Sequence, residues 1–101
     1  MLEIEEFTEH DKSTLMFSGE LSVANVSALQ QQLLKAASKV SYIDVKVTNV
    51  ENMDLSFLQL LLAWAQSMKQ SGKNLIFDFQ LDQEFERIFD ESGFRQAFSQ
   101  L

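Results

Sequence analysis

Hydrophobic and polar residues alternate along some segments of the chain and recur at helical spacing along others. Apolar Leu2, Ile4 and then Phe7 predict a first strand. Its outward side is expected to carry Glu3, Glu5 and Glu6. A polar turn at residues 9–12 and an apolar stretch at residues 15–17, ended by Ser18-Gly19, predict an antiparallel hairpin. Residues 42–47 and 74–79 are rich in β-branched or aromatic side chains, which predicts two further strands.

Helical spacing appears between and after these strands. Residues 22–39 predict a helix whose start Ser22 or Asn25 caps. Its apolar face holds Val26, Leu29, Leu33, Ala36 and Val40. After a loop at residues 49–54, a second helix is expected over residues 55–70, ended by Ser71-Gly72. A short helix around residues 85–89 breaks at Gly93, and residues 94–98 form a closing turn or helix. The order β-β-α-β-α-β-α-α predicts an α/β fold with a mixed sheet and parallel crossovers.

The helix over residues 55–70 has an unusually wide apolar arc of about 220° on a helical wheel. The arc predicts that the helix is wedged between the sheet and a neighbouring helix, or that part of it awaits a partner. The remaining stripe is polar or small and uncharged: Ser56, Gln59, Ala63, Gln66, Ser67 and Gln70. Such a stripe is either a plain surface or an interface that another protein covers at low desolvation cost.

Composition narrows the function classes. A chain of 101 residues predicts one domain, residues 1–101. The formal net charge of −7 disfavours direct binding to nucleic acid or anionic lipid. The absence of cysteine fits a reducing compartment, and the sequence shows neither a signal peptide nor an apolar run that could insert into a membrane. We therefore expect a cytoplasmic protein, and the motifs indicate no metal or other cofactor.

Asp54 and Ser56 stand at the start of the Leu-rich helix and support two interpretations. In the first, Asp54 is an N-cap worth about 1 kcal/mol and Ser56 has no special role. In the second, Ser56 accepts a phosphate, because free N–H groups and the helix dipole stabilise an anion at a helix start. The added charge would then repel a docked partner.

Four motifs give the chain a resemblance to the STAS domain family. The segment Met53-Asp54-Leu55-Ser56-Phe57-Leu58-Gln59-Leu60-Leu61 is similar to the family's loop-helix motif. Gly19-Glu20-Leu21 resembles the end of its second strand, and residues 42–50 resemble the strand and loop that lead into the motif. Ser92-Gly93-Phe94-Arg95-Gln96-Ala97-Phe98 resembles its closing helix. The resemblance covers nearly the whole chain, in the family's order of elements.

The resemblance implies a SpoIIAA-like STAS fold: a mixed sheet of four to five strands, an N-terminal hairpin, and three to four helices mainly on one face. It also implies a non-enzymatic protein-binding switch of the anti-sigma-factor-antagonist type. The partner would be a switch kinase or anti-sigma factor that phosphorylates Ser56 beside Asp54, and a homodimer is possible. The alternative is an unphosphorylated accessory subunit of a chemotaxis-type kinase complex or of a lipid-transport ABC system. The partner surface is expected to include Gly19, Ser22, Asn49, Asn52, Gln59, Ala63 and Gln66.

The motif departs from the family at two positions. Leu55 stands where a hydroxyl residue is common, and Phe57 stands where a glycine leaves room for a kinase loop. The sequence therefore predicts less space beside Ser56 than in classical members.

Other functions fit the sequence less well. A response-regulator receiver would need an acidic pair after its first strand and about 20 more residues. A hydrolase using Ser56 would need a base, but His10 is the one histidine and belongs to the hairpin turn. Trp64 and Met68 are interpreted as packing residues, although an exposed Trp64 would be a natural interface anchor.

Overall fold

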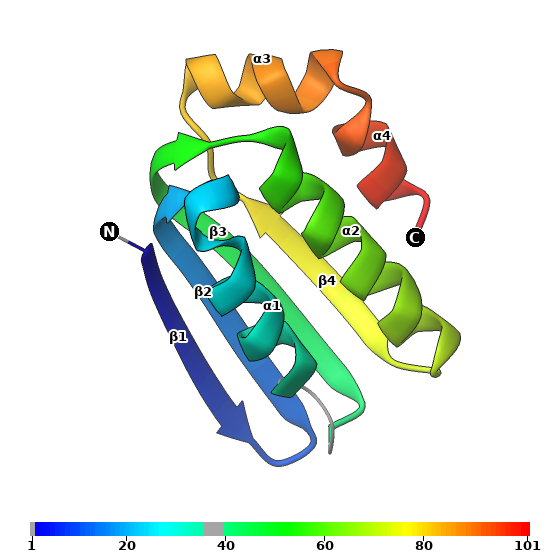
Figure 1. Cartoon of the computed structure of the whole chain (residues 1–101). Helices are drawn as coiled ribbons and strands as arrows, with labels where there is room; N and C mark the ends of the chain where they lie inside the picture. The colour runs from blue at the N-terminus through cyan, green and yellow to red at the C-terminus, as the bar shows by residue number, and fades with distance from the viewer. Residues whose placement is uncertain (1, 36–39) are drawn as a thin grey trace.

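Four strands form one sheet in the order β1-β2-β3-β4, with β1 and β4 at its two edges (Figure 1). The computed structural model describes residues 2–35 and 40–101. The strands are β1 (Leu2–Glu9), β2 (Lys12–Leu21), β3 (Tyr42–Met53) and β4 (Asn74–Phe79). β1 and β2 form the predicted antiparallel hairpin, whereas β3 runs parallel to both β2 and β4. The mixed sheet predicted from the order of elements is confirmed.

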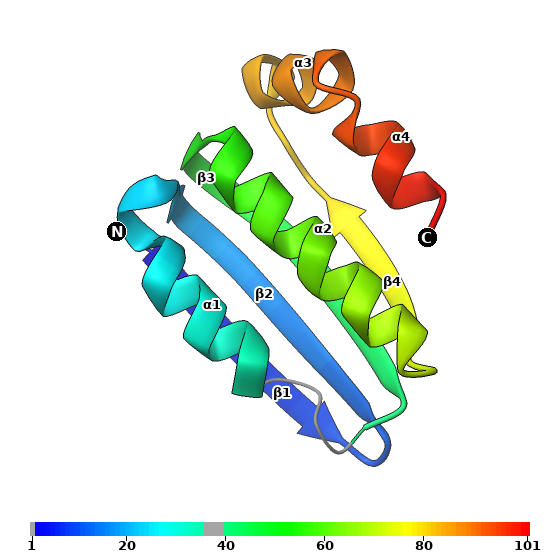
Figure 2. The ribbon, with the colours of Figure 1, turned by 45° about the vertical axis from the view of Figure 1, so that its right-hand side comes forward.

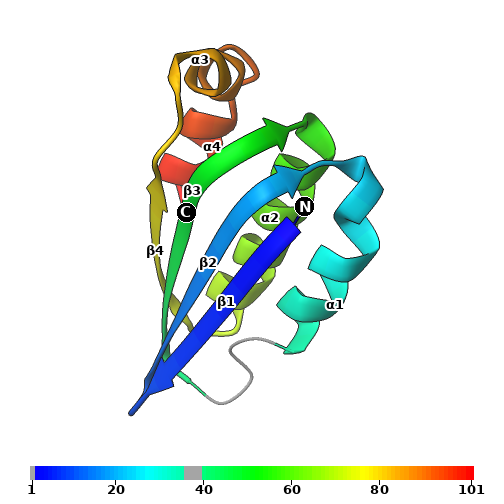
Figure 3. The ribbon, with the colours of Figure 1, turned by 90° about the vertical axis from the view of Figure 1, so that its left-hand side faces the viewer.

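The helices lie on one side of this sheet, and the other side is left open (Figure 3). They are α1 (Val26–Lys35), α2 (Leu55–Gln70), α3 (Gln83–Glu91) and α4 (Phe94–Ser99), with a 3₁₀ turn η1 (Val23–Asn25) before α1. α1 and α2 run side by side over the sheet, and α4 lies on the other side of α2 (Figure 2). α3 lies beyond the carboxyl ends of the parallel strands (Figure 1). The expectation that the helices pack mainly on one face is confirmed.

The core lies between the sheet and α1 and α2. Alternate residues of β2 and β3 are buried there, as the period of two in a strand requires. The helices contribute apolar residues at three- and four-residue steps: Leu29 and Leu33 from α1, and Phe57, Leu58, Leu61, Trp64 and Ala65 from α2. A second group of aromatic rings, in edge-to-face or tilted contact, joins β4 to α3 and α4: Phe77, Phe79, Phe89 and Phe98. α2 is therefore wedged between the sheet and neighbouring helices, as its wide apolar arc predicted.

The facing of β1 differs from the prediction at two residues. Glu6 was expected outward, but it pairs with buried Leu15, and its Oε1 accepts a hydrogen bond from Gln32 Nε2 of α1 at 3.1 Å. Phe7, expected inward, is exposed on the open face. The prediction was wrong because Ile4 and Phe7 are three residues apart, and a regular strand places such residues on opposite faces.

β2 and β3 both extend further than predicted. β2 continues past Ser18-Gly19, and β3 runs on through residues 49–53, where a loop was expected. Glycine and asparagine are common where strands end, so Gly19 and Asn49 predict strand ends in the sequence. In the structure both lie within strands, with positive φ angles of 86° and 49°, and the register between β2 and β3 shifts beside Gly19. The extended pair ends at Leu21 opposite Met53, so the segments that follow both strands begin side by side.

The predicted helix over residues 22–39 begins as η1, and α1 itself starts at Val26. Its last predicted residues, 36–39, lie outside the described residues. Ser22 occupies the N-cap position of η1 without a side-chain cap bond, and Asn25 Nδ2 donates to the Glu20 carbonyl at 2.9 Å. Neither residue caps the helix as expected; the carboxylate of Asp54, directly after the neighbouring strand β3, accepts from the first N–H of η1 instead.

Candidate functional site

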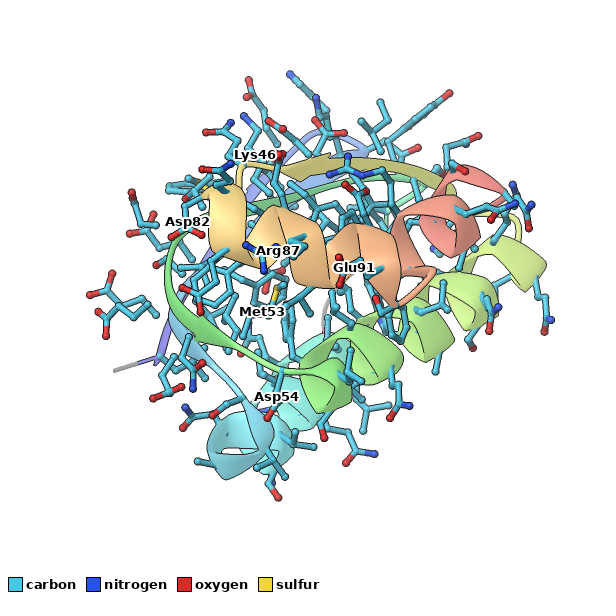
Figure 4. The ribbon with its side chains drawn as sticks, turned by 90° about the horizontal axis from the view of Figure 1, so that it is seen from above. Lys46, Met53, Asp54, Asp82, Arg87 and Glu91 are labelled. Carbon is cyan, nitrogen blue, oxygen red and sulfur yellow. The ribbon has the colours of Figure 1, made fainter. Side chains whose placement is uncertain are left out.

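Asp54 joins the starts of two helices. Its Oδ1 accepts a hydrogen bond from Phe57 N at 3.2 Å, the N-cap bond of α2. Its Oδ2 accepts one from Val23 N at 2.8 Å, and its own N–H donates to the Leu21 carbonyl at 3.2 Å. The N-cap interpretation is confirmed, and the same carboxylate also fixes η1. Seen from above, Asp54 lies at the junction of α2 and η1, with Met53 between it and α3 (Figure 4).

Ser56 is the second residue of α2 and is half-buried. Asp54 already occupies the Phe57 N–H, so one of the donors expected to receive a phosphate is taken. Within residues 2–35 and 40–101, the N–H groups of Leu55 and Ser56 have no acceptor. The hydroxyl therefore stands beside two free donors and one carboxylate, a mixed environment for an added anion.

Phe57 does not project toward the surface. Its side chain is 1% exposed and packs edge-to-face on Phe17 of β2, with ring centroids 6.1 Å apart. The expectation that this ring narrows the space beside Ser56 is wrong, because the third position of α2 faces the sheet. The phenylalanine fills core volume that glycine would leave empty.

The predicted partner-surface residues divide into exposed and buried ones. Asn49 and Asn52 of β3 and three residues of α2 are exposed: Gln59, Ala63 and Gln66. Gly19 and Ser22 are buried: Gly19 lies at the register shift between β2 and β3, and Ser22 directly precedes η1. Gly19 and Ser22 therefore shape the surface without offering side chains to it. Binding through the exposed five stays a prediction.

Two apolar side chains lie exposed beside Asp54: Val23 was not singled out in the sequence, and Leu55 was noted only as a departure from the family motif. Val23 of η1 is 67% exposed and Leu55 of α2 is 46% exposed, although both stand next to buried segments. They flank a carboxylate that is itself committed to backbone bonds. Val23 stands three residues before Val26 and so continues the three- and four-residue repeat of residues 26–40, which gives no signal of its exposure.

Trp64 and His10, the other residues weighed for a functional role, lie away from Ser56 or inside the core. Trp64 is 7% exposed and donates from Nε1 to the Leu33 carbonyl at 2.9 Å, which confirms that it is a packing residue. His10 is exposed at the hairpin turn, and the length of β2 separates it from Ser56 by about 30 Å.

The part of the chain that the structure describes contains no group of three or more His, Asp or Glu placed for a metal. Within the same residues, every helix is too short or too polar to span a membrane.

The arrangement of a hairpin, two parallel crossovers and a capped Leu-rich helix matches a known family. The family model described as "Mlab, STAS domain" matches residues 6–99. The chain belongs to the STAS domain family. Among curated proteins, no sequence matches this STAS domain.

Solved structures with the same fold include two forms of one regulator. The anti-sigma factor antagonist SpoIIAA in its unphosphorylated form superposes with a TM-score of 0.69 at 16% identity, over 93% of this STAS domain and 82% of that chain. The phosphorylated form of SpoIIAA, a Bacillus cell fate determinant, gives 0.67 at 17% identity, over 96% and 87%.

A longer protein, Mglu, also contains this fold. Its crystal structure superposes with a TM-score of 0.67 at 13% identity, over 78% of this STAS domain. The STAS domain spans only 20% of the Mglu chain. At these identities, the solved structures show a shared fold, and the predicted SpoIIAA-like fold is confirmed.

Proposed function

We propose that this STAS domain is a non-enzymatic protein-binding switch of the anti-sigma-factor-antagonist type. It docks on a switch kinase or anti-sigma factor through the amino end of α2, and phosphorylation of Ser56 releases the partner. The observation that carries the proposal is the position of Ser56: a partly accessible hydroxyl in the first turn of α2, next to exposed Leu55 and near exposed Val23.

The chemistry of this end of the molecule supports such a switch. Exposed aliphatic side chains stabilise a protein interface when they are desolvated, and a phosphate placed among them opposes that desolvation. The surrounding charges add to the effect, since Asp54, Asp82 and Glu91 lie at the same end as Arg87, and these carboxylates outnumber its guanidinium (Figure 4). A dianion on Ser56 would increase an existing negative potential, which lowers affinity for an apolar or acidic partner surface.

A second candidate is an accessory subunit that binds constitutively and is never phosphorylated, in a chemotaxis-type complex or a lipid-transport ABC system. The hydrogen bond from Phe57 N to Asp54 favours it, because this cap already neutralises a donor that a phosphate would use. Both candidates place the partner on the same end of α2, and they differ in the modification.

The test combines two measurements. Mass spectrometry of the protein isolated from its own cells examines Ser56 for phosphate. The affinity for candidate switch kinases and anti-sigma factors from the same genome is then measured for the native chain, Ser56→Ala and Ser56→Glu. We expect Ser56→Glu to weaken binding about tenfold or more, and Ser56→Ala to change it less than threefold.

Ser99→Glu is the matched control, because Ser99 is an exposed helical serine on α4 and the substitution adds the same charge. It should leave the affinity unchanged. If Ser56→Glu binds as tightly as Ser99→Glu, the switch is disproved. Tight binding of both variants together with absence of phosphate would instead select the constitutive subunit.

A further inference from the structure

We propose that the pocket at the turn between α2 and β4 binds a small organic phosphate monoester. This turn lies at the opposite end of α2 from α3 (Figure 1). Lys69, which lines the pocket, is about 20 Å from Ser56 along the helix axis, at 1.5 Å per residue. The inference goes beyond the proposed function and does not depend on it, because no residue of this pocket takes part in the proposed switch.

The pocket lies where α2 ends and the edge strand β4 begins. Its volume is about 380 Å³, and its lining includes Tyr42, Lys69, Lys73, Asn74, Leu75 and Ile76. No aspartate or glutamate lines it, although the chain has 15 acidic residues. It is therefore a basic pocket on an acidic protein, and the local potential there favours an anion.

The two lysines supply the positive charge. Among the residues that the structure describes, neither ammonium forms an ion pair with a carboxylate. Lys69 is exposed in the last turn of α2. Lys73 is half-buried, and its Nζ donates a hydrogen bond to the Val40 carbonyl. This bond holds the ammonium in place and uses one of its three N–H groups, so two remain for a ligand.

The backbone of β4 adds a further donor. Asn74 N donates to the Ser41 carbonyl at 2.9 Å and Gln80 N to the Val47 carbonyl at 2.8 Å, so the even-numbered residues turn their N–H groups toward β3. Alternate residues of a strand point their N–H groups in opposite directions. The N–H of Leu75 therefore points away from β3, at the free edge of the sheet and beside the two ammonium groups of the pocket.

Two sources of negative charge near the pocket are already compensated. The last carbonyls of a helix carry partial negative charge. Here the carbonyls of residues 67–69 accept hydrogen bonds from the N–H groups of Ser71, Gly72 and Lys73 at 3.0–3.1 Å. The carboxylate of Asp44, which pairs with Ile76 in the sheet register, is bonded to Lys12 Nζ at 2.8 Å. Neither source therefore offsets the two lysines.

The lining also indicates which anion fits. Two ammonium groups complement a dianion better than a monoanion. Lysine binds phosphate as a point charge, whereas the planar fork that suits a carboxylate belongs to arginine, which does not line this pocket. Ile76 is 65% exposed and Tyr42 is 54% exposed, so both offer apolar surface to an organic group. A pocket of this size holds a small molecule.

The experiment uses phenyl phosphate as the probe and the backbone amide spectrum of the isotope-labelled chain as the readout. At about pH 8 the probe is a dianion. We expect saturable shifts of the Lys73 and Leu75 amides with a Kd of roughly 1 mM. Benzenesulfonate, which has the same ring and a single charge, should bind about fivefold more weakly. Inorganic phosphate, which lacks the ring, should also bind about fivefold more weakly.

Lys69→Gln tests the site directly, and Lys35→Gln is its matched control. Lys35 is an exposed lysine in the last turn of α1, so both substitutions remove the same charge from the same helical position. Lys69→Gln should raise the Kd about fivefold, whereas Lys35→Gln should change it less than about twofold. Lys73→Gln should raise the Kd about tenfold, because this ammonium is held in place. Circular dichroism checks that each variant folds.

The inference is overturned if phenyl phosphate produces no saturable shift of these amides, if benzenesulfonate binds equally well, or if Lys69→Gln and Lys35→Gln behave alike. A lipid phosphate presents the same group, so cosedimentation with phosphatidylcholine vesicles that contain phosphatidic acid is measured in parallel. We expect none, because the net charge of −7 repels an anionic bilayer. Cosedimentation that Lys69→Gln abolishes would assign the pocket to a lipid headgroup and overturn the inference.

Discussion

α2 and α3 begin with the same local arrangement but differ in what surrounds it. Each starts at an Asp-x-x-Phe segment: Asp54 to Phe57 in α2 and Asp82 to Phe85 in α3. In both, Oδ1 of the aspartate accepts a bond from the phenylalanine N–H, at 3.2 and 3.1 Å. In both, the phenylalanine ring is buried. Four residues of sequence are thus enough to specify the cap and the direction of the helix.

The difference lies beyond those four residues. Asp54 uses its second oxygen for Val23 N, 31 positions away, whereas Asp82 makes its cap bond alone within the described chain. The second helical position is Ser56 in α2 and Glu84 in α3, so α3 already carries a negative charge where the proposed phosphate would stand. The cap geometry is the same in α2 and α3, so it does not distinguish them. The start of α2 is a candidate phosphorylation site because of its neighbours, Ser56 and the bonded Val23.

Of the paired substitutions at the two helix starts, Phe57→Ala should lower the free energy of unfolding the most. Phe57 is enclosed between α2 and β2, whereas Phe85 lies under the peripheral helix α3 at 7% exposure. We expect a loss of unfolding free energy of about 4 kcal/mol for Phe57→Ala and about 3 kcal/mol for Phe85→Ala. Urea unfolding followed by circular dichroism measures both. A smaller loss at Phe57 would contradict its assignment as the central core residue of α2.

Replacing the aspartates should have the next largest effect. Asp54→Ala removes two backbone hydrogen bonds and should destabilise the fold by about 2 kcal/mol, whereas Asp82→Ala removes one and should cost about 1 kcal/mol. The same unfolding experiment applies. In addition, hydrogen exchange at the Val23 amide should accelerate only in Asp54→Ala. Equal stability of the two variants would show that the bond to Val23 contributes nothing.

Exchanging the residues at the second position should have the smallest effect. Ser56→Glu makes the start of α2 resemble that of α3 and should change the free energy of unfolding by less than about 0.5 kcal/mol, since the helix dipole and Asp54 act in opposite directions on the new charge. Glu84→Ser should cost about 0.3–1 kcal/mol, and less in high salt. A large destabilisation by Ser56→Glu would mean that any loss of partner binding reflects unfolding.

Much of the fold follows from the sequence because local patterns and tertiary demands agree. The hairpin, the order of strands and helices, and the wide buried arc of α2 were all predictable from periodicity. Helix ends marked by Gly72 and Gly93 were equally clear, and both residues have positive φ angles. The strand ends were not, because glycine and asparagine commonly end strands. Here Gly19 lies at a bulge within β2 and Asn49 lies within β3.

The candidate site was predictable only in part. Asp54 and Ser56 could be identified from their place before a Leu-rich run. The bond from Asp54 to Val23 could not, because it depends on β2 and β3 ending at the same level. Phe57 was misread for a related reason: its side chain faces the sheet, and a motif comparison does not show which way a ring points.

The bonds that tie Asp54 to Leu21 and Val23 have a consequence for the order of assembly. Each joins residues more than 30 positions apart, so each forms only after β3 has crossed over and docked beside β2. The first half of the chain can build its hairpin and even its first helix while the start of η1 stays uncapped. A fragment that stops short of residue 54 therefore lacks the carboxylate that fixes the start of η1.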